Sequence, residues 1–435
     1  MKFPDISELY SLYLNSSLVI TDSRTVSSNC FFIALKGVNF NGNQFAASAL
    51  LQGAKYAVVD EEGYYKGENY ILVKDCLSTL QELASYHRKQ LKIPFIAITG
   101  SNGKTTTKEL IKSILSRKYK VLATKGNLNN HIGVPLTLLS ITSDTEIAVI
   151  EMGANHMGEI ALLCEFAQPD FGLITNIGRA HLGEFGSFEN IVKAKTEMYS
   201  FIERTKGKIF INSINDLLMS YALNIEKITY GNRESDFCFC KISGNEPHAN
   251  VEYENELIRS NLIGKYNFEN IHAAICIGKY FKIDKKLIKE AIETYVPSNN
   301  RSQTIQSKRN IILLDAYNAN PSSMHAAIEN FYEMAGENKW LILGDMYELG
   351  KYEIEEHKNI LQLIANKRFQ NVILVGKIFS KAISEMKIKF SHLLLFENSS
   401  ELVNKLKTTP LSEPPYLVLI KGSRGIMLEK AVEFL

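Results

Sequence analysis

The feature of the sequence that most constrains the fold is a glycine-rich stretch at residues 99–107, Thr-Gly-Ser-Asn-Gly-Lys-Thr-Thr-Thr. An apolar run at residues 95–98 precedes it, and a helical pattern with one apolar face follows it at residues 106–117. In this order the glycines let the backbone wrap a polyphosphate, and N–H groups at the helix start face the anion. Lys104 adds a positive charge, and the hydroxyl of Thr105 can ligate Mg²⁺. The predicted nucleotide site is Thr99, Gly100, Ser101, Asn102, Gly103, Lys104, Thr105 and Thr106, and the alternative is a glycine turn with a solvated lysine.

The order of apolar runs predicts an α/β protein with three domains. Residues 1–92 mix short apolar runs with one helical pattern at residues 77–90, which indicates a small α/β domain. In residues 93–296 strand-like runs alternate with helical stretches, and a helix at residues 267–281 closes the series. This pattern favours a mainly parallel sheet covered on both faces, as in P-loop ATPases. Residues 297–435 contain five more such repeats and predict a Rossmann-like domain. Their strand-like runs are at residues 310–314, 340–343, 372–375, 392–395 and 416–420.

Composition excludes several classes of protein. The 435 residues include 49 Lys and Arg and 47 Asp and Glu, and a formal net charge of +2 gives no field that would attract nucleic acid or a membrane surface. No run reaches the ~18 apolar residues of a membrane span, and the N-terminus does not resemble a secretory signal. We therefore expect no membrane insertion and a cytoplasmic location. The six cysteines include no C-x-x-C pair, and we interpret all of them as reduced core residues rather than as a metal cluster.

The phosphate loop is shorter than the common G-x-x-x-x-G-K-[ST] form, because only two residues separate its glycines. In this respect it resembles the Mur ligase superfamily, the ATP-dependent amide-bond ligases of peptidoglycan precursor synthesis and their folylpolyglutamate synthetase relatives. The resemblance extends along nearly the whole chain. It implies ATP and Mg²⁺ as cofactors, a monomer, and an ATP site that is completed when the C-terminal domain closes.

Further residues match catalytic positions of the family. Glu151 follows a buried strand, so its carboxylate can reach a metal held by the phosphate loop, and a helix-capping carboxylate is the alternative. The resemblance implies that Glu151 ligates Mg²⁺ and that His181 helps to hold a second Mg²⁺, although an isolated histidine is more often a structural donor. It also implies that Lys195 is carbamylated and bridges metal to substrate, with Lys193 as the competing candidate. Together with Lys104, these three are the expected catalytic residues.

Other residues resemble the family's nucleotide contacts. Asn270 lies in the frame G-K-Y-N-F-E-N, where the family usually has a histidine in place of Tyr266. It is the expected nucleotide contact, whereas Asn267 either shares that role or caps the helix. Arg301 and Asp315 resemble an arginine near the phosphates and an aspartate near the ribose.

Several stretches resemble one branch of the family, the ligases that add D-alanyl-D-alanine to UDP-N-acetylmuramoyl-tripeptide through an acyl phosphate. Residues 22–37 resemble the domain that binds the UDP end of this substrate, and residues 315–321, 344–350 and 421–425 resemble the branch's C-terminal motifs. The usual D-G-H is replaced by N-G-N at residues 41–43, which leaves the details of UDP binding open. The expected substrate contacts are Ser23, Arg24, Lys36, Asn127, Asn130, Asn318, Asn320 and Arg424.

Other interpretations stay open at this point. The chain could be a sister amide ligase, a nucleotide-binding protein without activity, or a phosphotransferase. For Asp345, Glu348 and Arg424 the alternative to a functional role is loop capping and surface pairing. The sequence does not specify the third residue of the tripeptide, the carbamylation of Lys195 or the openness of the domains.

Overall fold

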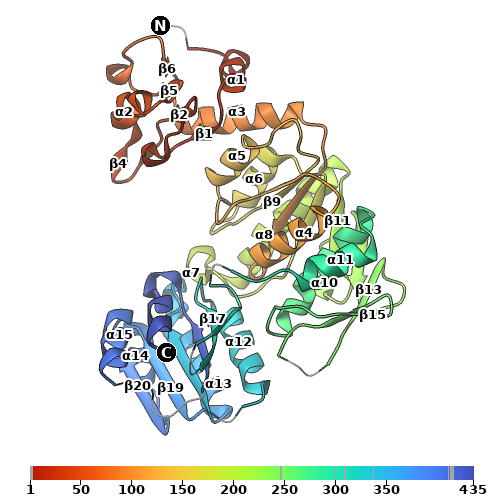
Figure 1. The fold of residues 1–435 in the computed structure, drawn as a ribbon, viewed down its shortest axis with the longest axis vertical. Helices are drawn as coiled ribbons and strands as arrows, with labels where there is room; N and C mark the ends of the chain where they lie inside the picture. The colour runs from red at the N-terminus through yellow and green to blue at the C-terminus, as the bar shows by residue number, and fades with distance from the viewer. Residues whose placement is uncertain are drawn as a thin grey trace.

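The chain forms three α/β units that follow one another along the long axis of the molecule, with the N-terminal unit at one end (Figure 1). The computed structural model describes residues 3–244, 247–298, 300–307, 310–336, 338–409, 411 and 416–435. Each unit has its own sheet, so the predicted α/β class with three domains is confirmed. The boundaries expected after residues 92 and 296 stay predictions.

The N-terminal unit is a small parallel sheet with three helices. Its elements are α1 (Ile6–Leu14), β1 (Val19–Ile20), β2 (Phe31–Ile33), β3 (Lys36–Gly37), β4 (Phe40–Asn41), α2 (Ala46–Leu51), β5 (Tyr56–Val59), β6 (Tyr70–Leu72) and α3 (Cys76–Gln90). The sheet order is β1-β2-β5-β6, and β3 pairs with β4 as a separate hairpin. Asp75 starts α3, because its side chain accepts a hydrogen bond from the N–H of Ser78. This helix packs against α1 and also against the central unit, and Arg88 near its end donates to the carbonyl oxygens of Ala167 and Gln168, at 2.7 Å each.

The central unit is built on a nine-stranded sheet. Its strands are β7 (Phe95–Thr99), β8 (Val121–Ala123), β9 (Ile147–Glu151), β10 (Phe171–Ile174), β11 (Lys208–Asn212), β12 (Glu226–Gly231), β13 (Cys238–Ile242), β14 (Val251–Tyr253) and β15 (Glu256–Ile258). Its helices are α4 (Lys104–Leu115), α5 (Gly133–Leu138), α6 (Glu159–Ala167), α7 (Leu182–Phe185), α8 (Phe188–Thr205), α9 (Asp216–Ser220), α10 (Tyr266–Tyr280) and α11 (Lys285–Glu293). The order is β15-β14-β13-β12-β11-β10-β7-β9-β8, in which only β14 and β15 are antiparallel to their neighbours.

The predicted parallel sheet of the central unit is therefore confirmed, but two details were not foreseen. The antiparallel strands β14 and β15 extend one edge, and α11 follows the helix that we expected to close the unit. Strands β7 and β9 are buried along their whole length, since helices cover both faces, which explains their continuous apolar sequences.

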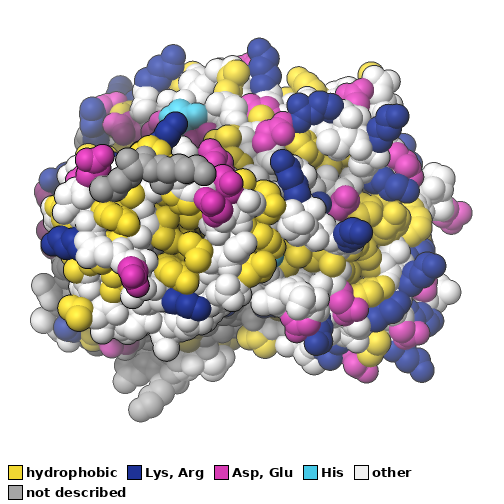
Figure 2. All heavy atoms as spheres, turned by 90° about the horizontal axis from the view of Figure 1, so that it is seen from above, with side chains coloured by type: hydrophobic (Ala, Val, Ile, Leu, Met, Phe, Trp, Pro, Cys, Tyr) yellow, Lys and Arg dark blue, Asp and Glu magenta, His cyan; other side chains and the backbone are white. Residues whose placement is uncertain are grey.

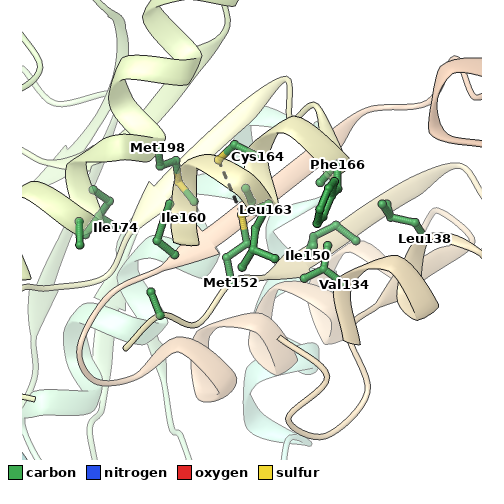
Figure 3. Packing of buried hydrophobic residues seen from close by; sticks show 14 of the residues in the cluster. Val134, Leu138, Ile150, Met152, Ile160, Leu163, Cys164, Phe166, Ile174 and Met198 are labelled. Carbon is green, nitrogen blue, oxygen red and sulfur yellow. Dashed lines mark hydrogen bonds between the residues drawn. The ribbon is translucent and has the colours of Figure 1, made fainter. Parts of the chain in front are cut away.

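A packed apolar cluster fixes the strand that leads into the candidate site. Ile150 on β9 and the following Met152 pack against Leu163 of α6 and Val134 of α5 (Figure 3). All four side chains are at most 1% exposed. Such close packing leaves the intervening Glu151 little freedom in backbone position, so the point from which its side chain starts is fixed.

The C-terminal unit has a six-stranded sheet. Its elements are β16 (Gln303–Gln306), β17 (Asn310–Asp315), α12 (Pro321–Glu333), β18 (Lys339–Gly344), α13 (Glu353–Asn366), β19 (Asn371–Val375), α14 (Lys377–Ser384), β20 (His392–Phe396), α15 (Ser399–Thr408) and β21 (Tyr416–Lys421). The order is β16-β17-β21-β18-β19-β20, and the five parallel strands are the five predicted runs. Asn320 caps α12 and Pro321 occupies its first turn. The antiparallel edge strand β16 was not predicted.

Charged side chains of both signs are mixed with apolar ones on the face that is seen from above (Figure 2). This mixture agrees with the small net charge of +2. Of the helices that the structure describes, none combines the length and the apolar character that crossing a bilayer requires.

Candidate functional site

A cavity of about 810 Å³ is lined by loops that follow strands of the central sheet and by residues of the C-terminal unit. The position agrees with the rule that ligands bind at the carboxyl ends of parallel strands. The predicted residues that line it are Ser101, Asn102, Gly103, Lys104, Thr105, Thr106, Asn127, Asn130, Glu151, His181, Asn270, Arg301, Asp315, Asn318 and Asn320. Those outside its lining are Thr99, Gly100, Lys195, Ser23, Arg24, Lys36 and Arg424.

The phosphate loop wraps tightly because two glycines allow it. Gly103 precedes α4 with φ +77°, and a Cβ atom there would lie 2.3 Å from Oδ1 of Asn270. The Nζ of Lys104 donates to the carbonyl oxygens of Gly100, at 2.7 Å, and Ser101, at 3.2 Å. Burial lowers the pKa of Lys104 to about 8, and the charge of Arg301 acts in the same direction. The lysine is thus held at the loop, in a position where a bound anion would raise its pKa again.

Thr105 and Glu151 form a compact pair of oxygen donors beside this loop. The hydroxyl of Thr105 lies 3.0 Å from Oε2 and 3.2 Å from Oε1 of Glu151, which is 1% exposed. Asn129 donates to Oε1 at 2.8 Å, and the fully buried Nζ of Lys108 lies 3.5 Å from Oε2. A hydroxyl and a carboxylate are the oxygen ligands that Mg²⁺ prefers, so this pair fits the ion.

Lys108 and Asn129 are contacts of Glu151 that the sequence analysis did not predict. Lys108 lies three residues after Thr105, on the same side of α4, so helical spacing was the available signal. Asn129 lies in the same polar stretch as Asn127 and Asn130, but nothing in the sequence indicated which of these amides faces the carboxylate. In the structure Asn130 instead accepts from the N–H groups of Ile132 and Gly133 at the start of α5.

His181 lines the cavity but contacts the C-terminal unit. Its backbone is left-handed, with φ 54°, and its Nδ1 lies 2.5 Å from Oε2 of Glu348. This contact lowers the pKa of Glu348, with the histidine as hydrogen-bond partner. The surface pairing that we considered for Glu348 is therefore present, and its partner is a residue expected at a metal.

Lys195 is almost completely buried behind the cavity wall, at 2% exposure. Its Nζ donates to the carbonyl oxygen of Ala154 at 3.3 Å and lies 5.5 Å from the ring centre of Phe185. Burial lowers the pKa of Lys195 to about 7, and the charge of Lys104 adds to the effect. A neutral amine is accordingly accessible near neutral pH. The competing candidate Lys193 lies on the exposed side of α8.

Asn270 connects α10 to the phosphate loop. Its Oδ1 accepts from the hydroxyl of Thr107 at 3.0 Å, and its Nδ2 donates to Oδ1 of Asn267 at 2.8 Å. Asn267 in turn donates to the carbonyl oxygen of Ile263, at 2.7 Å. The helix begins after Lys265, so the interpretation of Asn267 as the cap is wrong.

The C-terminal unit contributes charged groups to the cavity. The guanidinium of Arg301 lies 3.6 Å from the ring centre of Tyr317, and Arg424 lies 5.1 Å from the same ring. Asp315 is 2.5 Å from the Nζ of Lys421, a buried lysine that the sequence analysis did not single out as a contact. Asn320 donates from Nδ2 to Oδ1 of Asn102 at 2.8 Å, which joins the C-terminal unit directly to the phosphate loop.

The residues expected to bind the UDP end lie in the N-terminal unit, away from the cavity lining. Ser23 belongs to the short 3₁₀ helix Ser23–Thr25, and the exposed side chain of Arg24 pairs with Asp22 at 2.6 Å. Lys36 pairs with Asp60 at 3.1 Å. The structure therefore does not bring these three residues together with the phosphate loop.

The N-G-N stretch at residues 41–43 is held by its own hydrogen bonds. The Oδ1 of Asn41 accepts from the N–H of Asn43, whose Nδ2 donates to Asp60 at 2.8 Å. Between them, a Cβ atom at Gly42 would lie 2.2 Å from the carbonyl oxygen of Leu35, so glycine is required. The two asparagines thus keep the turn folded without the acid and histidine that are usual there.

Asp345 has the capping role that we gave as its alternative. Its carboxylate accepts from the N–H groups of Ile378 at 3.0 Å and Phe379 at 2.8 Å, at the start of α14. Nearby, the fully buried His357 accepts at Nε2 from the N–H of Met346 and contacts the carbonyl oxygen of Glu353 through Nδ1. Burial lowers the pKa of His357 to about 4.

The cavity brings together a phosphate loop, an adjacent pair of oxygen donors and a second sheet unit. This combination defines a class of protein, the multidomain nucleotide-dependent enzymes that close around their substrates. Comparison with known families agrees: the "Mur ligase middle domain" matches residues 98–278, the "Mur ligase, glutamate ligase domain" residues 300–424, and the "Mur ligase family, catalytic domain" residues 16–88. The chain belongs to the Mur ligase family, as the phosphate loop predicted.

Individual relatives resemble the chain over nearly its whole length. The UDP-N-acetylmuramoyl-tripeptide--D-alanyl-D-alanine ligase of Bacillus subtilis is 35% identical, covering 95% of this chain and 92% of its own. Crystal structure I of MurF from Acinetobacter baumannii matches with a TM-score of 0.85 and 29% identity, over 100% of this chain and 98% of that one. The MurF ligase of Thermotoga maritima in complex with ADP matches with a TM-score of 0.82 and 26% identity, over 97% of each chain.

Proposed function

We propose that this chain is the ATP-dependent ligase that joins D-alanyl-D-alanine to UDP-N-acetylmuramoyl-tripeptide in peptidoglycan synthesis. The observation that carries the proposal is the single cavity in which the phosphate loop, the Thr105–Glu151 pair and the C-terminal Arg301 face one another. The likeness to ligases of this name over the whole chain supports the choice of substrates.

The residues of the cavity suit phosphoryl transfer from ATP to a carboxylate. The loop amides at the start of α4 and the Nζ of Lys104 bind the phosphates, and Arg301 offsets charge that develops on the transferred group. The terminal carboxylate of the tripeptide becomes an acyl phosphate, and the amine of D-alanyl-D-alanine then attacks its carbonyl carbon, releasing phosphate and leaving ADP. Closure of the C-terminal unit excludes water, which would otherwise hydrolyse the acyl phosphate.

For Mg²⁺ we assign Thr105 and Glu151 as ligands, with His181 and a carbamylated Lys195 at a second ion. Bound Mg²⁺ supplies neutralising charge next to the phosphates. The neutral amine of Lys195 is the form that adds CO₂, and its pKa of about 7 makes that form available at neutral pH. Asn270 and Asp315 are assigned to the nucleotide, and Asn127, Asn130, Asn318, Asn320 and Arg424 to the peptide end of the substrate or the dipeptide.

We assign the UDP end of the substrate to the N-terminal unit, through Ser23, Arg24 and Lys36. The exposed side chain of Arg24 and the half-exposed side chain of Lys36 are accessible to a diphosphate. We place the enzyme in the cytoplasm, because its reaction consumes ATP and its six cysteines are all unpaired and buried, as a reducing compartment favours. The proposal of a monomer rests on the family resemblance alone.

The test is ATP-dependent phosphate release with UDP-N-acetylmuramoyl-tripeptide, comparing D-alanyl-D-alanine with single amino acids while the product mass is followed. Turnover with the dipeptide alone, giving a UDP-linked pentapeptide, is expected. Turnover with a single amino acid would instead identify a sister ligase, a phosphorylated product without a new amide would identify a phosphotransferase, and no turnover with any acceptor would refute the ligase assignment.

A further inference from the structure

Four potential metal ligands face one another in the central unit, on the far side of α10 from the nucleotide residues. Cys238 and Cys240 alternate along β13 and share one face of the strand, while His272 and Cys276 are four residues apart and share one face of α10. The strand packs against this helix. Ligand atoms of Cys238, Cys240 and His272 all lie within 4.8 Å of one another.

The sulfur of Cys238 is the centre of this group. The side chains of Cys240, Cys276 and His272 each interact with it. All four residues are at most 2% exposed. The proposed ligase mechanism uses none of them.

We propose that Cys238, Cys240, Cys276 and His272 form a structural Zn²⁺ site. Three sulfurs and one imidazole nitrogen are a complete tetrahedral donor set for this ion. Bonds of about 2.3 Å to sulfur and about 2.0 Å to nitrogen place the donor atoms roughly 3.5 to 3.8 Å apart. The spacing of Cys238, Cys240 and His272, within 4.8 Å, therefore needs only a small contraction, and the side chain of Cys276 has to move in as the fourth ligand. Binding replaces three S–H bonds by three Zn–S bonds and releases three protons.

The surroundings of the cluster suit such a centre. Three thiolates, one neutral imidazole and Zn²⁺ carry a net charge of −1. The ammonium of Lys279, on the same helix, acts electrostatically on both Cys240 and Cys276, while Glu254, which pairs with Lys279 at 3.5 Å, acts on Cys240 in the opposite direction. The Nε2 of His272 lies 3.0 Å from the carbonyl oxygen of Cys238, the kind of contact that fixes the tautomer of a ligating histidine and leaves Nδ1 for the metal.

The predicted role of the ion is to fasten the antiparallel edge of the sheet to α10. Strands β14 and β15 follow Cys238 and Cys240 along the chain, whereas α10 carries Asn270 two residues before His272. A bridge between β13 and α10 therefore also holds the helix that contacts the phosphate loop. The six cysteines are buried, as we predicted. Three of them, however, lie near His272, which is 32 residues or more from Cys238 and Cys240. At that distance in sequence the ligands form no recognisable motif.

The experiment measures metal content, which is independent of ligase activity. The full-length protein, produced in zinc-supplemented medium and purified without chelator, is expected to contain about one Zn²⁺ per chain. After exchange into Co²⁺, sulfur-to-cobalt charge-transfer bands and the intense d–d bands of a tetrahedral site are expected. Cys240→Ser and Cys276→Ser are expected to lose most of the bound zinc, whereas the matched control Cys164→Ser changes a buried cysteine of α6 and is expected to retain it.

Several results would overturn the site. The first is a wild-type protein that contains less than about a tenth of an equivalent of zinc and lacks the charge-transfer bands. The second is a wild-type zinc content in the Cys240→Ser and Cys276→Ser variants. A disulfide among the three cysteines, found by peptide mass analysis before reduction, would also exclude the site. If the serine variants fail to fold, the cobalt spectrum of the wild-type protein decides alone. Since none of these measurements requires turnover, their failure and that of the proposed ligase activity are distinguishable.

Discussion

Buried charges at the candidate site are balanced in pairs, and this balance governs how single substitutions act. Lys108 has no exposed side-chain surface, and its nearest carboxylates are those of Glu109, at 3.1 Å, and Glu151, at 3.5 Å. Glu109 is partly exposed, so Glu151 is the buried counter-charge. Activity and stability are therefore coupled at Glu151.

Glu151→Gln is expected to reduce ligase activity by at least about 100-fold, because a metal ligand is lost. It is also expected to destabilise the protein by about 3 kcal/mol, because the buried Lys108 loses its buried counter-charge and keeps only the partly exposed Glu109. The double variant Lys108→Met/Glu151→Gln is expected to recover most of the stability but none of the activity. Thermal unfolding and phosphate release measure the two effects separately. A double variant as unstable as the single one would show that the pair does not balance charge.

His357 is expected to make the stability of the C-terminal unit depend on pH. Its Nε2 accepts a hydrogen bond, so protonation would break that contact, and its pKa is lowered by burial to about 4. An unfolded histidine binds a proton near pH 6.5. The unfolded state therefore binds more protons between these values, and the free energy of unfolding falls as the pH drops, by ~2 kcal/mol between pH 7 and pH 5.

Urea unfolding of the wild type and of His357→Gln across this pH range tests the effect. The variant is expected to be less stable at pH 7 and to lose much of the slope, whereas His392→Gln, at an exposed histidine, is expected to keep it. Equal slopes in the wild type and His357→Gln would assign the pH dependence to other groups.

At the scale of elements, the start of α4 determines whether the phosphate loop can form. Gly103→Ala forces a Cβ atom into a left-handed position and against Asn270, 2.3 Å away. We expect the apparent KM for ATP to rise at least about 10-fold and the protein to lose about 1–2 kcal/mol of stability.

Gly158→Ala is a matched control for that substitution. Gly158 precedes α6 with φ +88°, but a Cβ atom there meets open space. The control is expected to lose a similar amount of stability through backbone strain, while its KM for ATP stays unchanged. An equal rise in KM in both variants would indicate that helix strain alone, and not the contact with Asn270, affects the nucleotide.

Elements with strong local signals were predictable from the sequence, and those defined by distant partners were not. The five parallel strands of the C-terminal unit and the cap at Asn320 follow from apolar runs and local capping chemistry. Strand β16, with alternately exposed residues, has no such signal, since its pairing with β17 defines it. Similarly, Thr105 was recognisable from the phosphate loop and Glu151 from its strand-end position. The partner Lys421, in contrast, depends on how separate elements pack.

At the scale of the whole molecule, polar contacts connect the central and C-terminal units. Arg179 pairs with the buried carboxylate of Glu356 at 2.7 Å, and His181 pairs with Glu348. Removing the first pair as Arg179→Ala/Glu356→Gln avoids a buried unpaired charge. We expect a larger radius of gyration in solution scattering without ligand, because the two units are then held together less tightly. We also expect a higher KM for ATP, because closing the cavity then costs more conformational entropy.

Lys208→Ala/Glu226→Gln is the corresponding control, since it removes an ion pair of the same 2.7 Å length between neighbouring strands of one sheet. Its scattering curve is expected to match that of the wild type. If the Arg179/Glu356 variant also matches the wild type, these contacts do not set the spacing of the two units.

The two junctions between neighbouring units differ in rigidity, and α3 forms the one between the N-terminal and central units. At its end Arg88 donates to Ala167 and Gln168 and lies 3.7 Å over the ring of Phe95, so the helix is clamped to the central unit by buried contacts. The contacts at the other junction include partly exposed ion pairs. When a force is applied to the two ends of the chain, we therefore expect the C-terminal unit to separate first, at a low force. The N-terminal and central units are expected to stay together and to respond as one body.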